Sequence, residues 1–287
     1  MKLNKDTRIL IVGLGLIGGS YAMALKKKGY HVNAISRSKD TIDYALENKL
    51  IDYGTTDVDS DLISSSDLVV FCLYPHVFYE WIKENQKYFK KGAIITDVTG
   101  IKVNIVYKIQ EILREDVEFI PSHPMAGREV YGVKNADCSI FKGANFVITP
   151  TDNNTTDAIE LCRNLGEELG FARISEISPE KHDDMIGFLS QLTHCIAITL
   201  MTCNNADHLQ DYTGDSFRDL TRIARINEDM WTELFMLNKD QLLKHISQFE
   251  VELDKLKIAL NQNDTETIKD IMRKSTARRA LFDKKEN

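Results

Sequence analysis

His123 and Arg222 are residues whose types suit chemistry on a small anionic molecule. A neutral imidazole can accept a proton near pH 7, because histidine titrates in that range. A guanidinium binds a carboxylate well, because its flat, two-pronged shape matches that of the anion. Taken alone, His123 could equally fix the turn before Pro124, and Arg222 could pair with Asp215 or Asp219 at the surface. The elements and motifs around His123 and Arg222 must therefore decide between a functional and a structural role.

A glycine-rich turn, G-L-G-L-I-G, follows the apolar run 8–12 and opens a helical pattern. In a dinucleotide-binding turn the first glycine makes the tight turn, the second lets the backbone approach a pyrophosphate, and the third lets the helix pack against the strand. The helix N-terminus then offers free N–H groups to the phosphates. A turn in some other α/β protein is the alternative. The residues of this turn expected to contact a dinucleotide are Gly13, Gly15, Leu16, Ile17 and Gly18.

The end of the next apolar run bears on the choice of cofactor. NAD enzymes usually place an acid there for the ribose 2′-hydroxyl, but this run ends A-I-S-R-S, with no acid before Asp40. Ser36 can donate a hydrogen bond, and Arg37 can pair with a 2′-phosphate. We therefore expect NAD(P)+ with a preference for NADP+, or acceptance of both if Arg37 is only a solvated surface residue. Leu73 and Thr99 are also expected in the cofactor site.

The elements that position these residues alternate in the first half of the chain. Short, nearly continuous apolar runs are typical of strands buried on both faces, and helical patterns lie between them, which predicts a parallel sheet covered by helices. The predicted strands are 8–12, 30–36, 67–74, 93–98, 117–121 and 145–149, and the predicted helices are 16–28, 39–48, 77–89 and 102–114.

After about residue 175 helical periodicity dominates, beginning where Pro179 suits the first turn of a helix. We therefore expect a Rossmann-type dinucleotide-binding domain over 1–175 and an all-helical domain for substrate binding and dimerisation over 176–287. Apolar residues recur at heptad-like spacing over 235–260, which predicts one long helix. That stripe could pack within the domain or against a second subunit.

Composition excludes several classes of protein. The net charge is −7, and a general nucleic-acid binder would normally carry a basic surface. The five cysteines form no C-x-x-C pair, and their odd number argues against a disulfide framework, so a reduced cytoplasmic compartment is expected. The apolar run near the N-terminus contains glycines and lacks a small-residue cleavage site, so it is not expected to be a signal peptide. No other stretch is expected to be long and apolar enough to span a membrane.

Four further segments accompany the glycine turn. They read D-V-T-G-I-K (97–102), S-H-P-M-A-G-R-E (122–129), H-D and S-Q-L-T-H (182–183 and 190–194), and D-S-F-R-D-L-T-R-I-A before M-W (215–224 and 230–231). In order and spacing, over about residues 7–260, they closely resemble the prephenate/arogenate dehydrogenases of tyrosine biosynthesis. The H-P-M-A-G and F-R-D-L-T-R-I-A parts are the most specific.

The resemblance implies oxidative decarboxylation of prephenate to 4-hydroxyphenylpyruvate. A hydride leaves C4 for NAD(P)+, the C4 hydroxyl loses its proton, and CO2 departs as the ring becomes aromatic. This chemistry needs a base near the hydroxyl, a cation near the carboxylates and a dry face for hydride transfer. The resemblance also implies a homodimer and no metal.

The resemblance assigns residues to these tasks. His123 matches the catalytic histidine, and Arg222 matches the arginine that holds the substrate carboxylate. Arg218, one helical turn earlier, would reach the same site or that of the neighbouring subunit, unless it only pairs at the surface. The other residues expected beside the substrate are His194, Ser190 and Gly127.

His194 also has an argument of its own. It lies with Gly187 and Ser190 at spacings of four and three on one face of a predicted helix, and this small polar stripe suggests the wall of a pocket. A histidine that is merely satisfied in the core is the alternative. His182 is ranked lower, as a first-turn residue.

The chain departs from the family pattern at two positions. Many relatives have a serine that assists the catalytic histidine where Gly100 stands, and Thr99 or Ser122 could supply the hydroxyl instead. Gln191 stands where some relatives carry another histidine.

Three other functions remain open. Arogenate dehydrogenase performs the same chemistry on an amino-acid side chain. A β-hydroxyacid-type dehydrogenase would need a lysine base in the helical domain, where only Lys181 lies between residues 179 and 204. A non-catalytic dinucleotide sensor would not need both His123 and Arg222.

Overall fold

The computed structural model describes residues 3–283. The chain forms two compact units, one ending at Asn238 and one beginning at Lys239, and each is described by itself. The predicted domain boundary near residue 175 falls inside the first unit and stays a prediction.

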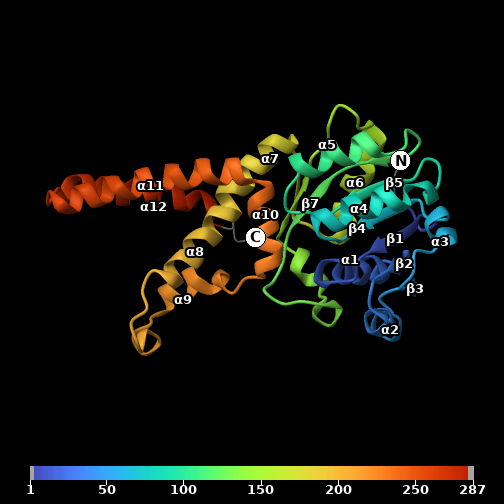
Figure 1. Ribbon diagram of the computed structural model, residues 1–287, viewed down its shortest axis with the longest axis horizontal. Helices are drawn as coiled ribbons and strands as arrows, with labels where there is room; N and C mark the ends of the chain where they lie inside the picture. Colours follow the sequence, from blue (N-terminus) through green and yellow to red (C-terminus); the bar gives the residue numbers. More distant parts are fainter. Residues whose placement is uncertain (1–2, 284–287) are drawn as a thin grey trace. The chain divides into compact units, whose positions relative to one another are not determined.

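A six-stranded parallel sheet forms the centre of the first unit, with the strand order β3-β2-β1-β4-β5-β6 and helices on both faces (Figure 1). This confirms the Rossmann-type fold. Its strands are β1 (Arg8–Val12), β2 (His31–Ile35), β3 (Tyr53–Thr55), β4 (Leu68–Phe71), β5 (Ile94–Asp97) and β6 (Glu118–Phe119). The helices that connect them are α1 (Leu16–Lys27), α2 (Lys39–Glu47), α3 (Ser60–Ser64), α4 (Pro75–Asn85) and α5 (Val103–Ile112).

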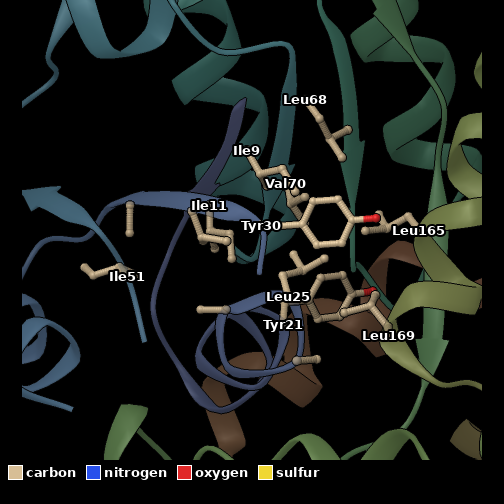
Figure 2. Close-up of a cluster of buried hydrophobic side chains, with 14 of the residues drawn as sticks. Ile9, Ile11, Tyr21, Leu25, Tyr30, Ile51, Leu68, Val70, Leu165 and Leu169 are labelled. Atoms are coloured by element: carbon tan, nitrogen blue, oxygen red, sulfur yellow. The ribbon is translucent and has the colours of Figure 1, made fainter. Parts of the chain in front are cut away.

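The two faces of this sheet bury separate hydrophobic cores. Ile9 and Ile11 of β1 belong to one core, and the alternate residues Leu10 and Val12 belong to the other. Figure 2 shows the first core, where the strand side chains meet Tyr21 of α1 and residues of α6 (Thr156–Leu169). Each such isoleucine contributes about 1.5–3 kcal/mol relative to exposure. Burial on both faces explains why the strands are continuous apolar runs.

A second sheet follows the first, with the order β7 (Ser122–Met125), β8 (Asn145–Ile148) and β9 (Arg173–Glu176). Strand β8 pairs antiparallel with β7 and parallel with β9. The expectation that 145–149 joins the main parallel sheet is therefore wrong. Pro121 separates β6 from β7, and because proline has no N–H to donate, the ladder on β5 cannot continue through it. His123 lies in β7, opposite Val147.

After β9, the regular elements of the first unit are all helical. It contains α7 (Pro179–Ile186), a π-helical turn (Gly187–Leu192), α8 (Thr193–Thr202), α9 (Asp215–Thr221) and α10 (Glu228–Leu237). Short 3-10 turns also occur at Gln86–Tyr88, Val133–Asn135, Cys138–Phe141, Leu209–Tyr212 and Arg222–Ala224.

Among the described residues, the helical run Pro179–Thr202 is long and apolar enough to cross a membrane, which differs from the sequence-based expectation. A single helix of this kind does not by itself indicate a membrane span, because core helices of soluble proteins have the same length and apolar composition. Its residues His182, Asp183 and Gln191 are buried and make polar contacts with other parts of the first unit.

The second unit consists of α11 (Lys239–Asn261), α12 (Thr265–Arg279) and a 3-10 turn (Ala280–Phe282). The prediction of one continuous helix over 235–260 is wrong, because α10 ends at Leu237 and α11 begins at Lys239. The residue between them, Asn238, is buried and donates its side-chain amide to the carbonyl of Asp183 and to Gln191. These hydrogen bonds hold the break in the helix.

Candidate active site

The glycine turn at the end of β1 has the geometry that a dinucleotide needs. Gly13 has φ of +100°, and a Cβ there would lie 2.5 Å from the carbonyl oxygen of Cys72. A Cβ on Gly18 would lie 2.0 Å from the carbonyl oxygen of Gly13, whereas a Cβ on Gly15 would meet nothing within 4 Å. Helix α1 begins at Leu16 without a side-chain cap, so its first N–H groups can bind phosphate. The turn therefore fits a pyrophosphate.

The three glycines predict a contrast between two alanine variants. We expect Gly18→Ala to lower the free energy of unfolding by about 1–3 kcal/mol, because the added methyl meets backbone. We expect Gly15→Ala to keep the melting temperature but to weaken cofactor binding by about tenfold or more, a change that needs only about 1.4 kcal/mol. Calorimetric melting and isothermal titration with NAD+ and NADP+ measure both effects. Equal loss of affinity and stability in the two variants would contradict this assignment of roles.

Three other residues expected to bind the cofactor lie near the glycine turn or at the end of β2. Ser36 is partly buried, and its Oγ accepts the N–H of Leu14 at 3.5 Å, while Arg37 is exposed at the end of β2. The side chain of Leu73 reaches within 2.9 Å of where a Cβ on Gly13 would stand.

A buried ion pair joins the end of β5 to the start of β7. Lys102 Nζ lies 2.7 Å from Asp97 Oδ2 and donates to the carbonyl of Ser122 at 2.5 Å, and both charged side chains are fully buried. Burial lowers the pKa of Lys102, and the charge of Asp97 opposes that shift. Ser122 adds a hydrogen bond from its N–H to Asp97 Oδ1. Because a buried ion pair is tolerated only with such further bonds, the network fixes the strand end that carries His123.

The hydroxyls of Thr99 and Ser122 are used within this network. Thr99 Oγ1 donates to Asp97, and Ser122 Oγ donates to the Asp97 carbonyl at 2.8 Å. Neither bonds to His123. Thr99 is buried, and in the described residues neither hydroxyl is directed at His123 in the way expected for a replacement of the serine missing at Gly100. The cofactor contact of Thr99 stays a prediction.

His123 instead bonds to a second histidine. Its Nδ1 lies 2.9 Å from Nε2 of His182, and His182 Nδ1 lies 2.7 Å from Asp183 Oδ1. His123 keeps part of its surface accessible, but burial of the ring, the nearby His182 and Lys102 hold its pKa well below the ordinary value. His123 is therefore a neutral imidazole at neutral pH, as a general base must be.

Helix α10 lies close to Gly100 and His123. Leu234 and the His123 ring both lie within 4 Å of where a Cβ on Gly100 would stand. Gln191 donates to the carbonyl of Leu234 at 2.9 Å, and the ring of His194 stacks on Trp231 with centroids 3.7 Å apart. His194 donates its Nδ1–H to the carbonyl of Ser190 at 2.9 Å, which leaves its Nε2 as an acceptor.

Arg222 contacts the segment 122–129, which contains His123, through an ion pair with Glu129. Burial lowers the pKa of His194, while the hydrogen bond to the Ser190 carbonyl and the charge of Glu129 raise it and the charge of Arg222 lowers it. His194 therefore senses the charges of the Glu129–Arg222 pair. The guanidinium side chain is 63% exposed, which leaves it accessible to a second anion.

The model for the nucleotide-binding domain of prephenate dehydrogenase matches residues 21–175, and the model for the prephenate dehydrogenase dimerization domain matches residues 178–274. The chain belongs to the prephenate dehydrogenase family. It is an oxidoreductase that uses NAD(P)+.

Members of this family are similar to the chain over nearly its whole length. The prephenate dehydrogenase of Bacillus subtilis is 30% identical over 275 residues, which are 93% of this chain and 74% of that protein. The crystal structure of A. aeolicus prephenate dehydrogenase with hydroxyphenyl propionate and NAD+ superposes with a TM-score of 0.90 at 28% identity, covering 98% of this chain and 100% of that chain. Synechocystis arogenate dehydrogenase gives 0.84 at 25% identity, covering 96% and 100%.

Within this family member, not every expected substrate residue meets the others. Arg218 pairs with Asp215 at 3.3 Å and is 60% exposed, and Gly127 is exposed with open space beside it. Conversely, sequence reasoning ranked His182 low and did not single out Glu129. The adjacent His182 and Asp183 at a helix start were the signal available for the first of these.

Proposed function

We propose that this chain catalyses the oxidative decarboxylation of prephenate to 4-hydroxyphenylpyruvate in tyrosine biosynthesis. The observation that carries the proposal is the neutral, partly accessible imidazole of His123, held on β7 beneath α10 with Arg222 tied to the same segment. The prephenate dehydrogenases similar to this chain support the choice of substrate.

In the proposed reaction, His123 accepts the proton of the C4 hydroxyl. Arg222 releases Glu129 and binds a substrate carboxylate. His194, which is stacked on Trp231, offers its Nε2 in a fixed orientation as a hydrogen-bond acceptor for the substrate. Bound NAD(P)+ supplies the hydride acceptor. Leu234 and Trp231 add apolar surface that limits water near the reacting atoms.

The direct test is a steady-state assay with purified protein, using prephenate and arogenate, each with NAD+ and NADP+. We expect reduced nicotinamide to form with prephenate. Turnover of arogenate alone would establish the alternative activity, which the similarity to the Synechocystis arogenate dehydrogenase supports. Cofactor binding without turnover of either substrate would overturn the proposal in favour of a dinucleotide sensor.

For the cofactor, we propose a preference for NADP+. The exposed Arg37 at the end of β2, with no acid before Asp40, supports binding of a 2′-phosphate. We expect Arg37→Ala to lower kcat/KM for NADP+ by about tenfold, the effect of about 1.4 kcal/mol, and to leave the value for NAD+ nearly unchanged. Lys39→Ala, which removes another exposed cation nearby, serves as the control. A wild-type enzyme that prefers NAD+ would defeat this argument.

We also propose that the chain forms a homodimer through its helical part. The match to a dimerization domain over residues 178–274 supports this, as do the exposed apolar side chains of Met185, Leu189 and Met201 on α7, the π-helical turn and α8. A monomer at micromolar concentration in analytical ultracentrifugation would contradict it.

We also propose a cytoplasmic location for the protein. All five cysteines are free, which suits a reducing compartment.

A further inference from the structure

We propose that His182, oriented by Asp183, is a positioning residue that fixes the tautomer of His123, so that Nε2 of His123 is the basic nitrogen. This inference rests on the proposed function, in which His123 is the base. The three side chains form a line from α7 to β7, with Nδ1–Oδ1 and Nε2–Nδ1 distances of 2.7 and 2.9 Å.

The direction of the hydrogen bonds begins at Asp183. Its Oδ1 accepts the N–H of Lys102 at 2.8 Å, and its Oδ2 accepts the N–H of Val103 at 2.8 Å. A carboxylate held in this way acts as an acceptor. His182 Nδ1 must therefore donate to it.

The two imidazoles then have one consistent arrangement when both are neutral. A neutral His182 that donates from Nδ1 has a lone pair on Nε2, which accepts a proton from the nearest donor. That donor is Nδ1 of His123. A neutral His123 that carries its proton on Nδ1 has its lone pair on Nε2, the nitrogen free to take the substrate proton.

The arrangement depends on a neutral His182. Burial lowers the pKa of His182 most strongly, Lys102 lowers it further, and Asp183 and Asp97 raise it. The groups that face it are thus Asp183 on α7, Lys102 before α5, Asp97 on β5 and His123 on β7. If His182 gained a proton on Nε2, it would donate to His123, and His123 would then carry its own proton on Nε2.

The position next to the His123 ring supports the importance of His182. Gly100 presents no side chain there, although a Cβ would find ordinary contacts of 3.7 Å with Leu234 and 3.9 Å with Cε1 of His123. The hydroxyls of Thr99 and Ser122 are used elsewhere. The tautomer of His123 therefore follows from its bond to His182.

The first test needs no substrate and no variant. Long-range ¹H–¹⁵N correlation spectra of the ¹⁵N-histidine-labelled enzyme report which ring nitrogen carries the proton, and the sequence has only seven histidines to assign. We expect His123 to be protonated at Nδ1 and His182 at Nδ1 at pH 7.5. A His123 ring protonated at Nε2 would overturn the proposal, whatever the enzyme turns over. Failure of prephenate turnover with the expected spectrum would count against the proposed function alone.

The second test compares two variants of one residue. His182→Leu removes the acceptor, whereas His182→Gln can still accept from His123 with its carbonyl and donate to Asp183 with its amide. We expect His182→Leu to lower kcat by about 10- to 100-fold, the scale seen when a group that orients an imidazole is lost, with little change in prephenate KM. We expect His182→Gln to recover most of kcat and the Nδ1-protonated His123.

The pH profile separates positioning from structure. In His182→Gln the acid limb of kcat/KM should reflect one protonation, because glutamine does not titrate, and in the wild type it should reflect His123 and His182 together. Melting temperatures of both variants show whether each folds. Equal kcat in the leucine and glutamine variants, both folded, would overturn the positioning role.

Discussion

His123→Ala is expected to lower kcat by about 10²–10⁴, which is the usual contribution of a well-placed general base. The reason is that no other neutral imidazole on β7 can take the hydroxyl proton, and burial keeps the pKa of His123 low enough for it to be unprotonated at neutral pH. Single-turnover and steady-state kinetics with prephenate measure the loss.

Cofactor affinity should survive this substitution, because His123 lies outside the glycine turn that binds the dinucleotide. His208→Ala is the matched control, since His208 is 73% exposed and pairs only with Asp211 in the contacts described. A His123 variant that keeps wild-type kcat would remove the residue from the chemistry.

Arg222→Ala should chiefly raise the KM for prephenate, because Arg222 is proposed to bind the ground state and the transition state alike. A hydrogen bond to a charged group contributes about 1.5–3 kcal/mol, and each 1.4 kcal/mol changes affinity about tenfold. The exposure of Arg222 places the effect toward the lower end, at about tenfold.

Two neighbouring arginines sharpen this experiment. Arg225→Ala removes an exposed cation three residues later and is expected to leave KM unchanged. Arg218→Ala decides whether that residue also contacts substrate, since its visible partner is Asp215. An unchanged KM in Arg222→Ala would sink the carboxylate assignment.

Local sequence determined the first elements well. The glycine turn, the continuous apolar strands and the helix after them predicted β1, α1 and β2 to within a residue or two, because both faces of the sheet are buried. Strand β3 and helix α3 were not predicted, since they are only three and five residues long and carry polar side chains.

Longer-range pairing was harder to predict. Strand β8 has the same apolar character as the central strands, but it pairs with β7 in a separate sheet after Pro121. The heptad-like spacing over 235–260 continues across Asn238, so periodicity alone could not reveal the break there. Both outcomes depend on tertiary hydrogen bonds rather than on local pattern.

The same distinction applies to the candidate site. Residue type and motif selected the glycine turn, His123 and Arg222 from the sequence. The contacts of His123 with His182 and of Arg222 with Glu129 join residues far apart in the chain, and no spacing rule encodes them. The hydroxyls of Thr99 and Ser122 bond to Asp97, and the sequence could not predict these bonds either, because they depend on the fold.

Asp183 ties together three parts of the first unit. Its carboxylate holds the first turn of α5 in the nucleotide-binding part, its backbone carbonyl accepts Asn238, and its neighbour His182 meets His123. A displacement of α7 away from β7 would break the bonds to Lys102, Val103 and His123 together and release the imidazole from its set orientation. Separation of these two elements and loss of the orientation of the base would then be a single event.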